Sequence, residues 1–451
     1  MTRPLWQLQA TELAARFAAR SATPLEALRS VMDRCAEVNG RLNAVVTFNP
    51  ASESDAMAST ARWQAGQALS PLDGVPITIK DNLLVQGLRT TWGSRAFADF
   101  VPDADEVPVS RLRRAGLVFI GKTNVPELTL QGYTDNALFG PTGNPWAPDL
   151  TPGGSSGGAA AAVAAGIGPL ALCTDGGGSI RRPAAHTGQF GFKPSAGAVQ
   201  RGKGFPALLG AFEVVGPIAR SVPDIAAMMN ILAPATGDPR HVAPSRILHV
   251  RSFNHQPVDP EIDRLVTEAA AALAIQGHVV VTVDSVDTFM PIDRIWPVVS
   301  SSGVAHLFDC HPELDALAGE SIRAMAETGR VCSGGDYAAA LAALEDMRHA
   351  FEALIDGYEM MLTPAIAAFS WEKEQSHPHS IAGVPVGPRG HALFTAFANA
   401  LGLPAITIPT ARGASGLPAG CQLIGQADGD RQLLAFAQAA SGSQPADMPT
   451  L

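Results

Sequence analysis

The sequence predicts an α/β fold: one large domain with a central mixed β-sheet that helices cover on both faces. Short apolar runs typical of strands alternate with helical periodicity through residues 71–122, and this alternation returns between residues 247 and 283. Further short apolar runs near the C-terminus look like strands that return to the sheet. A chain of 451 residues, 46% hydrophobic and 16% charged, is long enough to bury such a core.

Residues 1–66 are predicted to form an N-terminal helical layer without chemistry of its own. Apolar residues, among them Leu13 and Phe17, recur at helical spacing. Thr23 is suited to be an N-cap, and Pro24 then occupies the first position of a second helix. We therefore expect residues 7–66 to be helical.

The segment from residue 71 to residue 122 carries the first candidate for chemistry. Strands are predicted at residues 75–79 and 117–120, with a helix over 108–115 between them. Ligands of α/β sheets bind at the carboxyl ends of strands, and Lys80 falls at such an end. A lysine there is costly unless its amine is paired or has lost its proton, so Lys80 is a candidate base.

Two glycine-rich loops follow, and each of them delivers a serine. Ser155 lies within Gly153–Gly158, and Ser179 comes directly after three glycines. Glycine lets the backbone approach a bound group closely, so the N–H groups of such loops can face a ligand. Each loop alone is typical of a tight turn, but together with Lys80 they suggest a base, a relay and a nucleophile. The predicted elements here are a helix over 159–165, a strand over 169–173 and a second helix from near Ser179.

The second half of the chain is predicted to complete the sheet and to cover the site. Residues 286–358 are mostly helical, and we expect them to cover the pocket and set substrate choice. Ser221, followed by an acid three residues later, indicates a capping arrangement at the start of a helix. The other predicted elements are strands at 247–250, 279–283, 361–364, 405–408 and 422–424, and helices at 262–273 and 431–439.

These segments together resemble the amidase signature family of serine hydrolases. The resemblance spans nearly the whole chain and implies the amidase signature fold, with residues 71–220 as the signature core. It also implies that Ser179 is the nucleophile, that Ser155 is held by a cis peptide bond, and that Lys80 is the base. The matching stretches are 74–81, 153–158, 174–175, 177–181, 183–184, 191–194, 403–405 and 416–425.

The loop before Ser179 is the predicted oxyanion hole. The N–H groups of Gly176, Gly177, Gly178 and Ser179 are its candidate donors, since a glycine loop that enters a helix turns several donors the same way. Many members of the family carry a larger residue, such as threonine, at the position of Gly176. The glycine leaves the oxyanion geometry available but is expected to make the loop less rigid.

Neighbouring polar residues have structural interpretations. Ser156 is expected to hydrogen-bond within its own loop, and Asp175 to form a buried pair with Arg181 that steadies the glycine loop. Arg182 projects about 100° from Arg181 on a helix. It either faces the pocket, where it would favour an acidic or carbonyl-rich substrate, or lies at the surface. Further candidates for substrate contact are Gly154, Leu128, Gln131 and Tyr133.

Composition argues against several other classes of protein. A net charge of −10, with scattered lysines and arginines, argues against a nucleic-acid surface or a membrane patch. His377 and His379 lack helical spacing, so neither a metal site nor a cofactor is expected. Five widely separated cysteines and the lack of an evident signal peptide suit a cytoplasmic protein. The oligomeric state is left open, with a homodimer as one alternative.

Three functions remain. The first, which we expect, is a free-standing amidase that cleaves a small-molecule amide or related C–N carbonyl bond through an acyl-enzyme. The second is the glutaminase subunit of a tRNA-dependent amidotransferase, which needs partner chains and an ammonia outlet. The third, a nucleotide-binding protein, is disfavoured because Gly153–Gly158 lacks the lysine and spacing of a P-loop.

Overall fold

Several apolar runs of the chain form strands that are buried along their whole length, as strands inside a sheet covered on both faces must be. Examples are β2 (Pro76–Lys80), β4 (Leu170–Asp175) and β9 (Met360–Pro364). The computed structural model describes residues 3–234, 244–442 and 445–451. The other strands are β1 (Val45–Phe48), β3 (Val118–Thr123), β5 (Phe190–Lys193), β6 (Val214–Ala219), β7 (Arg246–Phe253), β8 (Val279–Val286), β10 (Ser380–Ile381), β11 (Val384–Pro385), β12 (Ala405–Pro409) and β13 (Gly420–Gly425).

Within the described residues, eleven strands form one mixed sheet in the order β1-β3-β2-β4-β6-β5-β12-β13-β9-β7-β8, while β10 and β11 form a separate ribbon. The strands β3, β2 and β4 run parallel to one another. Their carboxyl ends therefore meet at one edge, where Lys80 and Asp175 are the last residues of β2 and β4. The middle of the sheet is antiparallel, and β9, β7 and β8 are again parallel.

Successive side chains of one strand enter different hydrophobic clusters, so the sheet has a core on each face. In β3, Phe119 belongs to one cluster, whereas Val118 and Ile120 belong to another. In β9, Leu362 and Met361 are divided in the same way. This alternation is the period of two expected of a strand, and it confirms the predicted α/β domain with a mixed sheet covered on both faces.

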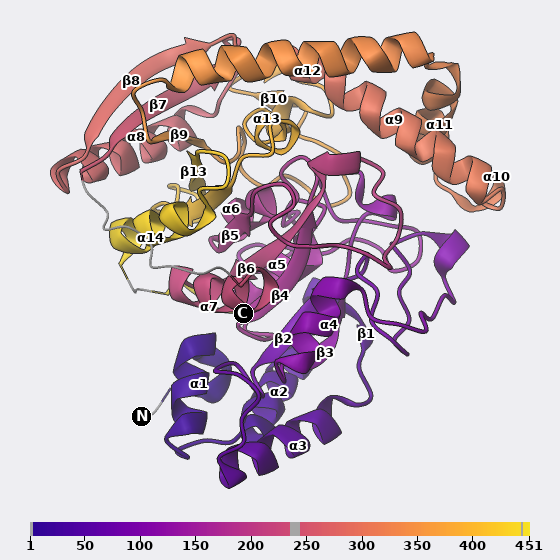
Figure 1. Cartoon of the computed structure of the whole chain (residues 1–451), viewed down its shortest axis with the longest axis vertical. Helices are drawn as coiled ribbons and strands as arrows, with labels where there is room; N and C mark the ends of the chain where they lie inside the picture. The colour runs from indigo at the N-terminus through magenta and orange to yellow at the C-terminus, as the bar shows by residue number, and fades with distance from the viewer. Residues whose placement is uncertain (1–2, 235–243, 443–444) are drawn as a thin grey trace.

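The helices gather in recognisable groups. In Figure 1, α1 to α3 lie at the lower end of the view, and the long α12 crosses the upper end above α9 to α11. In the part of the chain that the structure describes, no helix is both long and apolar enough to cross a bilayer. The helices are α1 (Ala10–Ala18), α2 (Pro24–Leu42), α3 (Ser52–Ala65), α4 (Val107–Arg114), α5 (Gly157–Ala165), α6 (Arg181–Thr187), α7 (Val222–Leu232), α8 (Pro260–Ile275), α9 (Ile292–Cys310), α10 (Leu314–Leu317), α11 (Glu320–Val331), α12 (Gly334–Ile355), α13 (Ala396–Ala400) and α14 (Asp430–Ser441).

Most elements lie within a few residues of their predicted bounds, and Thr23 caps α2 through a reciprocal bond with Glu26 as expected. One prediction is wrong: residues 7–66 are not all helical, because 45–48 form the edge strand β1, which pairs with β3. The strand β5 was missed because it contains a glycine, which weakens a strand signal. Residues 1–2 of the predicted N-terminal layer lie outside the described residues.

The capping arrangement at Ser221 is only half present. Its hydroxyl accepts a hydrogen bond from the N–H of Asp224, as predicted. The Asp224 carboxylate instead accepts from the N–H groups of Ala10 and Thr11, each at 2.9 Å. It therefore satisfies two N–H groups at the start of α1 that have no partner within that helix, which lies more than 200 residues away in the chain.

Candidate active site

Lys80 is the last residue of β2, and its side chain is fully buried. Its Nζ lies 2.8 Å from Ser155 Oγ, 3.1 Å from the Thr174 carbonyl oxygen and 2.9 Å from Thr174 Oγ1. Among the described residues no carboxylate lies within ion-pair distance of this amine, whereas the buried Lys122 on β3 is paired with Asp81 at 3.0 Å. Burial lowers the pKa of Lys80 from 10.5 to about 8, so the neutral amine is accessible near neutral pH.

Ser155 is in the glycine loop that precedes α5, and the Gly154–Ser155 peptide bond is cis. The two serine loops are joined by a hydrogen bond from the N–H of Ser156 to the carbonyl oxygen of Ser179, at 3.2 Å. The hydroxyl of Ser156 donates to the Thr174 carbonyl at 3.3 Å. The prediction that Ser156 bonds within its own loop is therefore wrong, because the loop packs directly against the end of β4.

Ser155 and Ser179 line a common cavity of about 180 Å³, here called the serine cavity. The hydroxyl of Ser179 makes no hydrogen bond to any described residue, so it is free to meet a bound group. The structure thus brings together the three residues singled out in the sequence, with Lys80 reaching the cavity through Ser155. The other residues lining the cavity are Thr129, Leu130, Gln131, Gly132, Thr174, Gly176, Gly177, Arg182, Leu209, Glu213, Trp296, Met325, Pro388, Arg389, His391 and Ala392.

The loop before Ser179 is organised by Asp175. This carboxylate accepts hydrogen bonds from the N–H of Gly178 at 2.6 Å and of Ile180 at 3.0 Å, and it forms the predicted buried ion pair with Arg181 at 3.0 Å. Burial alone would raise the pKa of Asp175, but the Arg181 guanidinium and the backbone donors hold it well below its usual range.

This geometry removes one predicted oxyanion donor, because the N–H of Gly178 is already committed to Asp175. No such acceptor is present among the described residues for the N–H groups of Gly177 and Ser179. Gly178 has a φ of +116°, and a Cβ there would lie 2.2 Å from Thr395 Oγ1, so the position requires glycine. At Gly176 a Cβ would meet Leu209 Cδ1 at 2.3 Å, so Leu209 fills the space that a larger residue would occupy.

The candidate substrate residues divide into two groups. Gln131 and Arg182 line the serine cavity, and the alternative that Arg182 lies at the surface is wrong, since it is 7% exposed. Leu128 is instead fully buried in a hydrophobic cluster with Trp92. Gly154 packs against the backbone of Tyr133, since a Cβ on Gly154 would lie 2.4 Å from the Tyr133 carbonyl oxygen. Neither Gly154 nor Tyr133 lines the cavity.

Sequence reasoning missed the residues of the cavity that come from distant segments. Trp296 and Met325 extend from α9 and α11, within the region predicted to cover the pocket. Arg389 and His391 come from the segment before α13, which carries no recognisable pattern. Thr174 belongs to a stretch that matches the family, but nothing in the sequence predicts that it accepts hydrogen bonds from Lys80.

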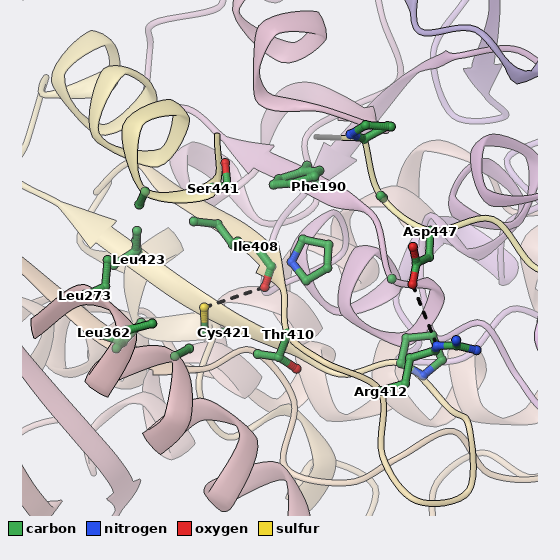
Figure 2. Close-up of a pocket in the computed structure, with 18 of the residues that line it drawn as sticks. Phe190, Leu273, Leu362, Ile408, Thr410, Arg412, Cys421, Leu423, Ser441 and Asp447 are labelled. Atoms are coloured by element: carbon green, nitrogen blue, oxygen red, sulfur yellow. Dashed lines mark hydrogen bonds and ion pairs between the residues drawn. The ribbon is translucent and has the colours of Figure 1, made fainter. Parts of the chain in front are cut away.

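A second cavity, of about 340 Å³, lies away from this chemistry. Figure 2 shows that its wall is formed by apolar side chains such as Leu362 and Leu423, with the pair Arg412–Asp447 at one side. Its hydroxyl side chains, Thr410 and Ser441, donate to backbone carbonyl oxygens. Its thiol, Cys421, is deeply buried, and burial raises the pKa of this thiol to about 12. A protonated thiol of this kind is unreactive, so the serine cavity is the candidate active site.

Comparison with known proteins gives one consistent family. The sequence model of the Amidase family matches residues 26–434. An acylamidase of Rhodococcus erythropolis is 35% identical over 440 residues, 92% of this chain and 91% of the relative. A glutamyl-tRNA(Gln) amidotransferase subunit of Moorella thermoacetica is 32% identical over 475 residues, 96% of each chain.

Solved structures agree with the sequence relatives. A bacterial aryl acylamidase of the amidase signature family matches with a TM-score of 0.88 at 28% identity, over 97% of each chain. The peptide amidase of Stenotrophomonas maltophilia matches with a TM-score of 0.80 at 25% identity, over 98% of this chain and 99% of the other. This chain therefore belongs to the amidase signature family and is an amide-hydrolysing enzyme.

Proposed function

We propose that the protein is a free-standing amidase that cleaves a small-molecule carboxamide, or a related C–N carbonyl bond, through a serine acyl-enzyme. Ser179 is the nucleophile, Ser155 the relay and Lys80 the base. The observation that carries this proposal is the 2.8 Å approach of the buried Lys80 Nζ to Ser155 Oγ, beside the free hydroxyl of Ser179 in the serine cavity.

The mechanism follows from what an amide demands. Its carbonyl is stabilised by resonance and its amine is a poor leaving group, so attack needs an activated nucleophile and a proton for the nitrogen. Neutral Lys80 takes a proton from Ser155, which takes one from Ser179 as Ser179 Oγ attacks the carbonyl carbon. Ser155 then protonates the departing nitrogen and regains a proton from the Lys80 ammonium. A water molecule next attacks the acyl-enzyme and passes a proton through Ser155 to Lys80. The acid leaves as the same two transfers run in reverse and return a proton to Ser179.

The tetrahedral intermediates carry a negative oxygen that needs donors. The N–H groups of Gly177 and Ser179 supply them in this proposal, with Gly176 as a third candidate at the end of β4. Each such donor is worth about 10²–10³ in rate in other enzymes. Thr174 acts as a positioning residue, because it holds the Lys80 amine through both its carbonyl and its hydroxyl.

The experiment that tests this function is labelling by a fluorophosphonate probe. We expect the wild-type protein to be labelled and Ser179→Ala to be unlabelled. Ser156→Ala, which changes a serine that faces the Thr174 carbonyl instead of the cavity, should keep the label. Labelling that persists in Ser179→Ala would remove this residue as the nucleophile.

A second candidate function is the glutaminase subunit of a tRNA-dependent amidotransferase. It is favoured by the full-length similarity to the amidotransferase subunit of Moorella thermoacetica, at 32% identity. Such a subunit works with partner chains, whereas a free-standing amidase needs none. Purification from the native host separates the two. Co-purifying partner chains together with ammonia release from glutamine would favour the amidotransferase role, whereas turnover of small amides by the isolated chain would favour the amidase.

A further inference from the structure

Two guanidinium groups in the serine cavity have no acidic partner among the described residues. Arg182 Nε donates a long bond, 3.4 Å, to the Gly178 carbonyl, and its terminal nitrogens bond to no described residue. Arg389 lies over the Trp296 ring at 4.1 Å from the centroid, and its buried Nε has no hydrogen-bond partner in the described part of the chain. Both groups remain charged at neutral pH, although burial lowers the pKa of Arg182 to about 9 and that of Arg389 to about 10.

The surrounding side chains that the structure describes do not form ion pairs with these two arginines, and Asp293, whose charge acts on Arg389, is not within ion-pair distance of it. Glu213, the carboxylate that lines the cavity, is ion-paired with Arg201. Asp175 is likewise committed to Arg181. His391 is neutral, because burial first, and then the nearby arginines, hold its pKa well below the usual range, and its buried Nδ1 has no partner among the described residues. The cavity wall therefore carries two positive charges, one on the buried Arg182 and one on the partly exposed Arg389, together with unsatisfied buried donors. Such an arrangement is costly unless a ligand compensates it.

We propose that the substrate of this enzyme carries a carboxylate, and that Arg182 and Arg389 bind it. This inference rests on the proposed amidase function, and it names the substrate class of the same site. A carboxylate accepts several hydrogen bonds from guanidinium groups with matching geometry and neutralises their charge. None of the described residues that line the serine cavity offers a carboxylate that is not already in an ion pair.

The position of Arg182 also limits the length of the substrate. Arg182 is three residues after Ser179, and its Nε returns to the carbonyl oxygen of Gly178 in the loop beside the nucleophile. Its Nη1 would lie 3.3 Å from a Cβ on Gly132, which lines the same cavity. The cavity, at about 180 Å³, is close to the size that holds benzene in an engineered protein core, about 150 Å³. In this proposal the part of the substrate between its scissile carbonyl and its carboxylate is therefore short, a few bonds long.

The test compares short amides that carry a carboxylate with their methyl esters, in which a methyl group removes the charge. Succinamate is compared with its methyl ester, which places the carboxylate on the acyl side, and N-acetylglycine with its methyl ester, which places it on the amine side. Affinities are measured by calorimetry on Ser179→Ala protein, so that the readout does not require turnover. We expect one carboxylate to bind about 10–100-fold more tightly than its ester, the effect typical of a charge-assisted hydrogen bond.

The variants separate the two arginines from a general loss of structure. In the Ser179→Ala background, Arg182→Met and Arg389→Met should each abolish the preference for the carboxylate. Arg412→Met is the matched control, because Arg412 also lies over a tryptophan ring, Trp146 at 4.8 Å, but lines the second cavity (Figure 2). The preference should survive in that variant.

Each outcome decides the proposal. Equal affinity for both carboxylates and their esters would overturn it, as would a preference that persists in either arginine variant or disappears in Arg412→Met. Labelling of wild-type Ser179 by a fluorophosphonate tests the amidase function independently. A labelled enzyme without a preference for carboxylates would refute the arginine site alone and leave the proposed function standing.

Discussion

The pH dependence of turnover tests Lys80 as the general base. Burial lowers the pKa of Lys80 to about 8, and the base works only as the neutral amine. About a tenth of the enzyme is then competent at pH 7 and about a hundredth at pH 6. We expect kcat/KM for a non-titrating amide to rise about tenfold per pH unit below pH 8 and to level off above it.

Another buried lysine, Lys193, provides a control for this experiment. Lys193 is fully buried, its Nζ donates to the Pro194 carbonyl at 2.8 Å, and burial lowers its pKa to about 7. It does not line the serine cavity. Lys193 titrates in a similar pH range. Its titration can therefore alter the stability of the fold and produce a second limb, or pH-dependent rise, in the profile of kcat/KM against pH. Lys193→Met should therefore keep the limb near pH 8, whereas Lys80→Ala should lose turnover while keeping its circular dichroism spectrum.

Two results would contradict this reasoning. The first is a kcat/KM that stays flat from pH 6 to pH 9, since a base of this pKa must change its protonation in that interval. The second is a limb that disappears in Lys193→Met, because the titrating group would then be Lys193. Turnover by Lys80→Ala at the wild-type rate would remove the lysine from the mechanism.

Three further variants test the surroundings of the site. Asp175→Asn leaves the buried Arg181 without its counter-charge and should lower the free energy of unfolding by about 3–5 kcal/mol in urea titrations. A change under about 1 kcal/mol would show that this ion pair does not stabilise the fold. Gly178→Ala forces a side chain into a φ of +116° against Thr395, and should cost about 1–3 kcal/mol and reduce kcat; wild-type kinetics would contradict the contact. Asp224→Ala removes the acceptor for the first two N–H groups of α1 and should cost about 1–2 kcal/mol while kcat/KM stays unchanged, so an equal melting temperature would argue against this contact.

The residues that sequence could predict are those whose chemistry is local. Lys80 stands out because a charged amine ends an apolar run, and Ser155 and Ser179 because glycines surround them. The pairing of Asp175 with Arg181 follows from their separation by six residues across one loop. In each case the segment alone indicates an unusual backbone or an unusual burial, and the structure places these segments at one edge of the sheet.

The residues that could not be predicted depend on the order of the strands. Arg181 also donates to Gln422 at 2.6 Å and to the Thr395 carbonyl at 3.0 Å, and both are more than 200 residues away in the chain. Gln422 stands on β13, and only the sheet order brings β13 within reach of α6. Arg389 could not be predicted either, because its segment has no periodicity. Its role as a candidate binding residue depends on its contact with Trp296 and on its position in the cavity wall.

Gly176 shows how a distant segment supplies the volume that a small residue leaves empty. The absence of a side chain there suggested a less rigid loop, since glycine has more freedom than a larger residue. Leu209, from the segment before β6, fills this space, while Trp296 Nε1 donates to the Gly176 carbonyl at 3.3 Å. Because both contacts come from residues that line the serine cavity, the small residue and its large neighbour form one unit, and the shape of the cavity depends on how they fit together.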